Sequence, residues 1–417
     1  MSADDESQRK LEKPVCDVST VVAFVNANWT LPGGPIDPKS VKQLNSYDDR
    51  NFFGVTVDGV HSYTLKVHNG VESVNTGLLA AQTAMMRHLQ KHGVPAPVPM
   101  RSNKSIDYIG SINDANMKKP IHDDVCFLEL ESVQTDSEHT KSRFHAVRVL
   151  TWLEGELAER SKRVVHNPEF LRDVGVFFGK MSVALKSFQH PGCQRHHLWD
   201  TANALEVKQF ISAIKDSKNL EVALNVLEDF ERIVAPHGKS LRRSPIHGDL
   251  NDQNVLVVVI LPSVADEFFS PGQRPVAPMA KPSAILDFGD IVVSWCVNEI
   301  AVAAAYFSLG SDDPVGAIAE IVTGYESQFP LTETERRILP TLIQSRLVCS
   351  VVCGAYSASK DPANEQYLLM TQKSGWVALR AMRECGDDLF RKRLDVSRLA
   401  NERGEPVGGV TKWIETQ

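Results

Sequence analysis

The sequence predicts an α+β protein of two lobes, a small antiparallel β-sheet lobe followed by a larger, mainly helical lobe. Two changes of pattern along the chain support this prediction. Apolar residues alternate with small or polar ones within residues 41–67, and Asp58-Gly59 is a strong hairpin signal. After residue 155 the apolar residues recur every three or four positions, which is typical of amphipathic helices. A chain of 417 residues is also too long for one small hydrophobic core.

The lobe boundaries follow from the order of these patterns. We expect residues 1–18 to form a disordered tail, because their first part is polar and charged and lacks the apolar stretch of a secretory signal. The β-rich lobe is predicted over residues 19–150 and the helical lobe over residues 151–417. The hinge between them is expected in residues 147–155, where the chain leaves the predicted sheet at a glycine.

Local signals place the elements inside each lobe. In the first lobe, the predicted helices cover residues 19–29 and 74–92, and further strands cover residues 63–67, 125–130 and 143–152. In the second lobe, predicted helix starts lie at Asn167-Pro168, Asp313-Pro314 and the capping box Thr332–Glu335, and helical segments at residues 204–234 and 362–385. The proline-rich residues 262–282 are predicted to be a surface excursion.

The composition excludes several functional classes. The hydrophobic fraction is 42% and the charged fraction 23%, as in ordinary globular proteins. A formal net charge of −7 argues against a nucleic-acid partner, which usually requires a basic patch. The 7 cysteines form no CxxC pair and are predicted to be reduced thiols. Because we find no apolar run of the roughly 18 residues that span a bilayer, we expect a cytoplasmic protein without a membrane partner.

Two motifs carry the chemistry of the chain, His247-Gly-Asp-Leu-Asn-Asp-Gln-Asn254 and Ile285-Leu-Asp-Phe-Gly-Asp290. Phosphoryl transfer requires a group that orients the attacking hydroxyl and ligands that hold metal ions beside the phosphates. Asp249 would accept the hydroxyl proton, and Asn254 and Asp287 would offer the hard oxygen ligands that Mg²⁺ prefers. Both spacings match those of protein kinases, except that Gly248 stands where protein kinases have arginine.

Each motif alone has an ordinary alternative. A lone Asp-Phe-Gly is often a turn after a strand, but the two motifs in this order favour phosphoryl transfer. Lys66 in the predicted return strand is expected to contact nucleotide phosphates, whereas taken alone it would be a solvent-facing lysine. Gln82 occupies the place of the helix glutamate that orients this lysine in kinases.

A polar loop over residues 45–51 precedes Lys66 and is expected to cover the phosphates. Since it contains no glycine, the side chains of Ser46, Tyr47 and Asn51 and backbone amides would contact the nucleotide. The adjacent carboxylates of Asp48 and Asp49 are expected to point elsewhere, in a hydrogen-bonded turn. In the hinge, the backbone near Arg148 and Leu150 is expected to pair with a purine.

The His-Gly-Asp form of the first motif resembles the aminoglycoside phosphotransferase and choline kinase superfamily, the small-molecule relatives of protein kinases. Within it, four stretches resemble the hydroxylysine kinases: residues 44–52, 247–254, 285–290 and 371–376. The resemblance implies a two-lobed protein-kinase-like fold and Mg²⁺-dependent transfer from GTP, or ATP, to 5-hydroxy-L-lysine. It also implies a nucleotide-binding first lobe and a second lobe for catalysis and substrate.

Roles carried over by the resemblance make Asp249 the base, with His247 bracing its loop or simply packed in the core. A substrate with two amino groups should meet carboxylates, for which Asp252, Asp290 and Glu299 are candidates; Trp199 could line the same pocket. A kinase for choline, ethanolamine, homoserine or an aminoglycoside would share the same motifs. A silent, nucleotide-binding scaffold is the alternative from another class, which Gln82 favours slightly and the complete motif set opposes.

Overall fold

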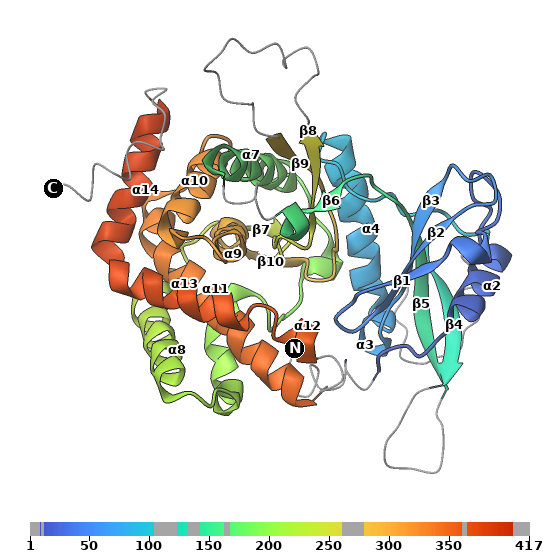
Figure 1. The fold of residues 1–417 in the computed structure, drawn as a ribbon, viewed down its shortest axis with the longest axis horizontal. Helices are drawn as coiled ribbons and strands as arrows, with labels where there is room; N and C mark the ends of the chain where they lie inside the picture. Colours follow the sequence, from blue (N-terminus) through green and yellow to red (C-terminus); the bar gives the residue numbers. More distant parts are fainter. Residues whose placement is uncertain are drawn as a thin grey trace, which may run out of the picture. The chain divides into compact units, whose positions relative to one another are not determined.

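The computed structural model describes residue 9 and residues 12–103, 123–131, 142–161, 167–260, 279–360 and 365–402. By its internal contacts the chain divides into two compact units. The first unit comprises Met1–Gln90, Ala96–Leu153 and His190–Arg195, and the second comprises Lys91–Pro95, Glu154–Gln189 and His196–Gln417. The main boundary therefore falls between Leu153 and Glu154. Two short segments, Lys91–Pro95 and His190–Arg195, belong to the unit on the other side of this boundary, which the sequence patterns did not indicate. Figure 1 labels the elements of both units.

The first unit is built on one antiparallel sheet with the strand order β1-β2-β3-β5-β4. Its strands are β1 (Lys42–Leu44), β2 (Arg50–Val55), β3 (Ser62–Val67), β4 (Cys126–Glu131) and β5 (Ser142–Thr151). The predicted hairpin is confirmed, with Gly59 at a φ of 72° between β2 and β3. Its positive φ is readily available only to glycine, which explains the Asp-Gly turn.

The two faces of this sheet differ in character. Phe52, Leu65 and Val149 point to one face and pack with helix α2 (Val18–Asn28) in a hydrophobic cluster. Lys66 lies directly opposite both Asn51 on β2 and Arg148 on β5. Since directly paired residues of antiparallel strands share a face, these three polar side chains form a row on the other side.

Helices cover both faces of this sheet. Helix α2 confirms the helix expected over residues 19–29, and α4 (Thr76–Lys91) confirms the one expected over residues 74–92. A short helix, α3 (Gly70–Ser73), lies between β3 and α4. The hydroxyl of Ser73 accepts a hydrogen bond of 2.8 Å from the Ala146 amide, which ties α3 to β5.

The second unit contains two small antiparallel sheets. One has the order β6-β8-β9, formed by β6 (Glu156–Leu157), β8 (Val255–Ile260) and β9 (Met279–Ile285). The other pairs β7 (Arg243–Ile246) with β10 (Val292–Trp295). After Asp290 the chain first forms β10, whose four residues complete the pair with β7, and only then becomes helical.

The predicted excursion over residues 262–282 is partly wrong. Residues 261–278 lie outside the described residues, whereas residues 279–282 belong to strand β9. Pro282 is opposite Val257, next to a register shift between Leu256 and Val257. Because β9 is an edge strand, a residue without an N–H is tolerated there.

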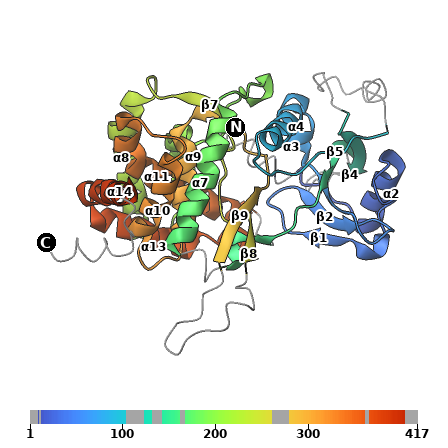
Figure 2. The ribbon, with the colours of Figure 1, turned by 90° about the horizontal axis from the view of Figure 1, so that it is seen from above.

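Helices make up most of the second unit: α7 (Pro168–Leu185), α8 (Ser217–Asp229), α9 (Val297–Phe307), α10 (Pro314–Glu326), α11 (Glu333–Lys360), α12 (Glu365–Leu368), α13 (Gln372–Cys385) and α14 (Asp387–Glu402). Figure 2 shows α7 beside the β8–β9 hairpin and α10. The three predicted starts are confirmed, with N-caps at Asn167 and Asp313 and a reciprocal Thr332–Glu335 capping box. The helical region predicted over residues 204–234 contains most of a 3₁₀ segment (Thr201–Ala213), which is followed by α8. Helix α14 was not predicted.

Helix α11 alone among the described helices is long and apolar enough to cross a membrane, a property that the search for apolar runs missed. In the protein, 94% of its most apolar stretch is buried. It packs against α9, α13 and the 3₁₀ segment. Core helices of globular domains have the same character.

Candidate active site

The loop between β7 and β8 begins with His247, whose side chain is completely buried. Its Nε2 lies 3.0 Å from the Leu286 carbonyl oxygen, and its Nδ1 lies 3.3 Å from the Asp249 amide nitrogen. The ring also makes an edge contact with Phe288, at 5.0 Å between centroids. His247 therefore connects the two sequence motifs, with Nε2 placed to donate to the Leu286 carbonyl and Nδ1 placed to accept from the Asp249 amide.

Both carboxylate oxygens of Asp249 have hydrogen-bond donors. Oδ1 accepts from the Arg346 guanidinium at 2.9 Å. Oδ2 accepts from the side-chain amides of Asn254 at 2.8 Å and Asn251 at 2.9 Å. These contacts fix the direction in which the carboxylate presents its remaining lone pairs.

Backbone geometry explains why glycine stands at position 248, where protein kinases have arginine. Gly248 has a φ of 81°, and a Cβ atom built there would lie 2.8 Å from the carbonyl oxygen of Asp290. A side chain at this position would therefore be strained in its backbone and would clash with the second motif. The His-Gly-Asp turn allows the two motifs to pack closely.

The pKa of Asp249 is raised to about 7, first by burial and then by the negative charge of Asp290, with a smaller contribution from Asp287. The positive charge of Arg346 opposes this rise. The two motifs meet directly beside Asp249, since Gly248 lies against the Asp290 carbonyl and His247 contacts the Leu286 carbonyl. A carboxyl group that titrates near neutral pH is suited to proton transfer.

Arg346 is a site residue that the motif analysis missed. It lies in the middle of α11 with an exposure of 1%, and it also donates to the backbone carbonyl of Trp199. Its guanidinium lies 5.4 Å from the ring centroids of both Trp199 and Tyr306. A lone arginine inside an apolar helix was the available signal, because a buried charge requires a partner.

The two predicted metal ligands have oxygen atoms suited to Mg²⁺. The Asn254 amide nitrogen donates to the backbone and side chain of Asp249, so its amide oxygen faces the opposite way. Asp287 is exposed, and its Oδ1 accepts a hydrogen bond of 3.1 Å from the Gly289 amide. Among the described residues, Asp287 is the one non-glycine with a positive φ, at 52°. Aspartate tolerates this left-handed region, which often marks functional turns.

Glu299 occupies a different position from the one expected of a substrate contact. It lies on α9 with an exposure of 1%. Its two oxygens accept hydrogen bonds from the backbone amides of His247, at 2.6 Å, and Gly248, at 3.2 Å. Burial raises its pKa, and these amides partly offset that effect. The predicted role is therefore corrected: Glu299 holds the backbone of the catalytic loop.

The other predicted substrate residues lie in the same unit. Asp290 is partly exposed, and its Oδ1 lies 3.0 Å from Nε2 of His197. Asp252 is also partly exposed, and its backbone carbonyl accepts from the Glu159 amide at 3.0 Å. Trp199 contacts the Arg346 guanidinium through both its ring and its carbonyl. The three residues thus lie on or beside the segments that hold Asp249.

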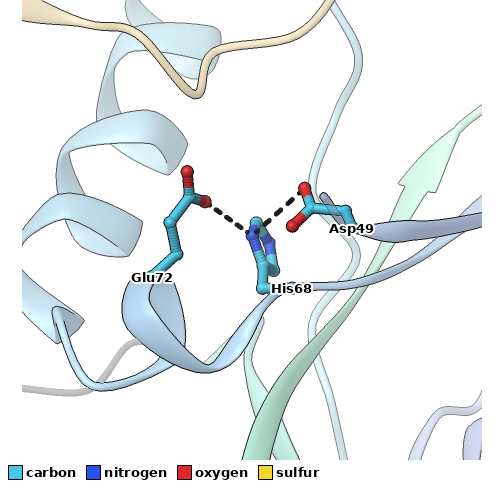
Figure 3. A group of neighbouring side chains, drawn as sticks. All are labelled: Asp49, His68 and Glu72. Carbon is cyan, nitrogen blue, oxygen red and sulfur yellow. Dashed lines mark hydrogen bonds and ion pairs between the residues drawn. The ribbon is translucent and has the colours of Figure 1, made fainter. Parts of the chain in front are cut away.

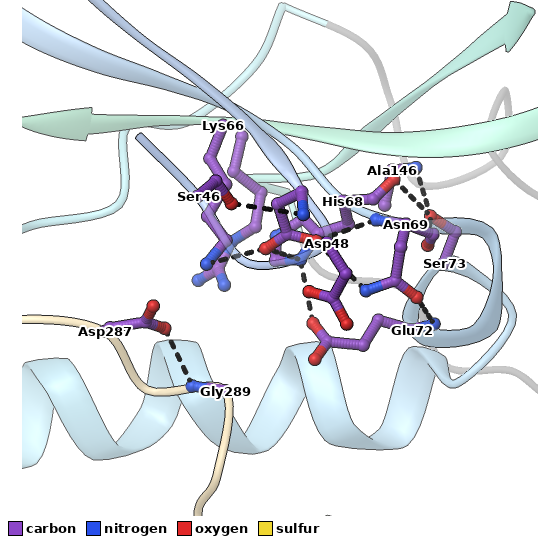
Figure 4. Close-up of polar contacts among 12 residues, drawn as sticks. Ser46, Asp48, Lys66, His68, Asn69, Glu72, Ser73, Ala146, Asp287 and Gly289 are labelled. Atoms are coloured by element: carbon purple, nitrogen blue, oxygen red, sulfur yellow. Dashed lines mark hydrogen bonds and ion pairs between the residues drawn. The ribbon is translucent and has the colours of Figure 1, made fainter. Parts of the chain in front are cut away.

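In the first unit, the carboxylate that holds Lys66 is Asp49, at 2.9 Å. The second oxygen of Asp49 accepts from the backbone and side-chain nitrogens of Asn69, at 2.8 and 3.0 Å. Figure 4 shows this group of polar residues around Lys66, Asn69 and Glu72. An aspartate of the polar loop, rather than Gln82, therefore holds Lys66.

Gln82 instead contacts Arg148. Its amide oxygen accepts from the guanidinium at 2.8 Å, and Thr83 and Asp124 hold the other end at 2.5 and 3.3 Å. Arg148 has an exposure of 1% and Gln82 of 2%. These two side chains are buried against each other between α4 and β5, so the proposed nucleotide site uses neither of them. The backbone contact expected near Arg148 and Leu150 stays a prediction.

The remaining predicted nucleotide contacts lie on or near the polar loop. The Ser46 hydroxyl accepts from the Asp49 amide at 3.1 Å, and the Tyr47 carbonyl accepts from Lys13 at 3.3 Å. The side-chain oxygen of Asn51 is buried without a hydrogen-bond partner in the described chain. Leu150 is nearly buried on β5, where it forms a bridge with Pro99.

Figure 3 shows a buried group of Asp49, His68 and Glu72 whose ligand atoms lie within 4.8 Å of one another. This spacing would suit a metal ion. However, His68 Nδ1 lies 3.0 Å from Glu72, while Lys66 lies 2.9 Å from Asp49. Lys66 and Arg9, which lies 2.7 Å from Glu72, thus already pair with these carboxylates, and we assign no metal to them.

The fold and these residues define a class, that of the kinase-like phosphotransferases. An antiparallel sheet bears a paired lysine, and a mainly helical unit bears an aspartate–asparagine loop and a second aspartate after a strand. The chain belongs to the phosphotransferase enzyme family, whose model matches residues 40–259, more than half of the chain.

Individual relatives agree with this assignment. The chain is 30% identical to hydroxylysine kinase of Xenopus laevis, over 85% of this chain and 87% of the relative. It is 30% identical to hydroxylysine kinase of Bos taurus, over 92% of this chain and 94% of the relative. A solved microcompartment-associated aminopropanol kinase has the same fold, with a TM-score of 0.56 and 13% identity over 92% and 99% of the two chains. The chain is therefore a small-molecule kinase that acts on a hydroxyl group and takes its phosphoryl group from a nucleotide.

Proposed function

We propose that this chain transfers the γ-phosphoryl group of GTP to the hydroxyl of 5-hydroxy-L-lysine, with Asp249 as the base. The observation that carries the proposal is the environment of Asp249. Arg346 and Asn254 hold its two oxygens, and its pKa is raised towards neutrality by burial and by Asp290. A fixed carboxylate of this kind can accept the hydroxyl proton as the new O–P bond forms.

The donor side of the proposal rests on both units. Asn254 and Asp287 would hold Mg²⁺, which neutralises phosphate charge when it is bound. Lys66, held by Asp49, would contact the phosphates, and Ser46 and Tyr47 belong to the loop proposed to cover them. GTP in preference to ATP is taken from the family resemblance, since no side chain in the described chain identifies a guanine.

The acceptor side rests on the two relatives and on charge. Both are hydroxylysine kinases matched over most of their length. Asp252 and Asp290 are partly exposed carboxylates on the two motifs, and they could pair with the amino groups of the acceptor. Trp199 lies beside Arg346 and could contact the apolar part of the acceptor.

The direct test is nucleotide consumption by the purified protein with Mg²⁺. GTP and ATP would be compared across hydroxylysine, lysine, choline, ethanolamine and homoserine. We expect turnover with hydroxylysine and none with lysine, because lysine lacks the acceptor hydroxyl. Turnover with another amino alcohol alone would overturn the acceptor assignment, and bound nucleotide without any turnover would support a silent scaffold.

Replacing the proposed base is the sharpest single test. Asp249→Asn keeps the size of the side chain but removes its ability to accept a proton, so we expect kcat to fall by about 10²–10⁴-fold. Nucleotide affinity, measured by titration calorimetry, should remain within about twofold, because the proposed metal ligands are unchanged.

Asp312→Asn is the matched control, since Asp312 is an exposed carboxylate before α10. It should leave both kcat and nucleotide affinity unchanged. An equal loss of turnover and nucleotide binding in Asp249→Asn would show that the base is misassigned.

A further inference from the structure

The N-terminal residues Arg9 and 12–14, here called the N-terminal strap, contact the polar loop of residues 45–51 at three points. Arg9 donates to the carboxylate of Asp48. Lys13 donates to the carbonyl of Tyr47 at 3.3 Å, and Arg50 donates to the carbonyl of Pro14 at 3.1 Å. The predicted disorder of residues 1–18 is thus wrong for the strap, while residues 1–8, 10 and 11 lie outside the described chain.

The strap is also attached on the side away from the loop. The carbonyl of Glu12 accepts from the Gly70 amide at 3.0 Å, at the start of α3. The carboxylate of Glu12 lies 2.6 Å from Arg143 on β5. A Cβ atom at Gly70 would lie 2.3 Å from Oε2 of Glu12, so a side chain there would displace the Glu12 carboxylate. The strap therefore joins the polar loop to α3 and β5.

Arg9 meets an accumulation of buried negative charge. Asp48, Asp49 and Glu72 have exposures of 5%, 5% and 2%. Arg9 contacts two of them, Asp48 and, at 2.7 Å, Glu72, whereas Lys66 contacts the third. A buried carboxylate without a cation is strongly unfavourable.

The pKa values of these carboxyl groups agree with the pairing of Arg9 with Asp48 and Glu72. Burial raises the pKa of Asp48 to about 6 although Arg9 opposes the rise. Burial also acts against the ionised form of Glu72, but Arg9 and His68 hold its pKa well below the usual value. Without Arg9, the pKa of both Asp48 and Glu72 would rise, and a carboxylate that stayed ionised would act on Lys66, the next cation in the group.

We propose that the N-terminal strap is a working part of the nucleotide site and that Arg9 is a positioning residue. By neutralising Asp48 and Glu72, Arg9 leaves Lys66 with positive charge to offer to a phosphate, and the strap holds the polar loop in shape. This inference rests on the proposed function, in which Lys66 and the loop contact the nucleotide.

The test is Arg9→Gln in the full chain, with binding of a fluorescent GTP analogue as the readout. The substitution removes the cation that neutralises Asp48 and Glu72, so a carboxylate that stays ionised would pair with Lys66, and nucleotide binding should weaken by about tenfold. The KM for the acceptor should not change. Lys39→Gln, which removes one cation from an exposed position in the same unit, should bind the analogue like the wild type.

A second substitution separates charge from packing. Asp48→Asn in the Arg9→Gln background removes the unneutralised carboxylate, so it should restore most of the lost affinity. Rescue supports the electrostatic role. A lower melting temperature of Arg9→Gln with unchanged nucleotide affinity would overturn the proposal, because it would limit Arg9 to stability.

Hydrogen exchange in the absence of nucleotide distinguishes failure of this inference from failure of the proposed function. The amides of residues 45–50 should exchange faster in Arg9→Gln than in the wild type and Lys39→Gln. Unchanged exchange would overturn the strap's hold on the loop, whatever the protein binds. A wild type that binds no nucleotide would overturn the role in the nucleotide site together with the proposed function.

Discussion

The carboxylate of Asp249 depends on three donors that reach it from two parts of the chain. Asn251 and Asn254 belong to its own loop, whereas Arg346 is 97 residues away on α11. The local donors follow from the motif, because an Asp-x-x-x-x-Asn loop brings the amide back to the aspartate. The distant donor, Arg346, follows only from the packing of α11 against the loop, which no local pattern in the sequence specifies.

Activity should depend on pH through Asp249. Because the base must be ionised, kcat/KM for the acceptor should fall as the pH decreases through the raised pKa of Asp249, about 7. Asp290→Asn removes the largest neighbouring charge that raises this pKa, so the acid limb should move to lower pH.

The measurement is kcat/KM at constant ionic strength between about pH 5 and pH 9. Asp290 is also a proposed acceptor contact, so the position of the limb rather than the height of the curve is the readout. Asp312→Asn should leave the limb in place. A limb that stays at the wild-type pH in Asp290→Asn would contradict the electrostatic coupling.

At the scale of elements, the catalytic loop is held by a helix rather than by its own strands. Glu299 on α9 accepts hydrogen bonds from the backbone amides of His247 and Gly248, at the start of this loop. Helices α7 and α10 meet in the same unit at glycines: Cβ atoms at Gly175 and Gly324 would each lie 2.0 Å from a carbonyl oxygen of the other helix. These glycines allow backbone contact between the two helices.

This helix contact should be sensitive to a single methyl group. Gly324→Ala would force α7 and α10 apart, and overpacking of this kind costs about 1–3 kcal/mol. We therefore expect a lower midpoint of thermal unfolding. Gly77→Ala on α4 is the matched control, because its nearest neighbouring atom lies at 3.7 Å and alanine favours a helix by about 0.5–1 kcal/mol. A Gly324→Ala protein as stable as Gly77→Ala would contradict the close contact.

At the scale of the whole molecule, all 7 cysteines are free. Five are buried, and Cys16 and Cys385 are partly buried. Burial raises the pKa of Cys16 and Cys193 to about 11 and that of Cys349 to about 12. The chain therefore depends on packing rather than on cross-links for its stability.

Thiol titration should reflect this arrangement. With a chromogenic disulfide at about pH 8, the native protein should react slowly, because thiolates are the reacting species and burial suppresses them. In denaturant all 7 thiols should react. Fewer than 7 under denaturing, non-reducing conditions would reveal a disulfide, and a reducing agent should leave the unfolding midpoint unchanged.

The sequence by itself determined the fold class, the order of most elements and the two motifs of the site. These features are local: periodicity, turn residues such as Asp58-Gly59, caps such as Asn167, and Asp249–Asn254 spacing all act within a few residues. Residues that share a loop, such as Asp249 and Asn254, or a strand pair, such as Asn51 and Lys66, therefore lie together as the sequence predicts.

Only the tertiary structure decided which distant groups neutralise the charged residues. Asp49 rather than Gln82 holds Lys66, Arg346 holds Asp249, and Glu299 holds the catalytic loop. Arg9 likewise meets Asp48 across 39 residues of sequence. The physical reason is that burial makes any unpaired charge costly, but which of several charged residues becomes the partner depends on packing.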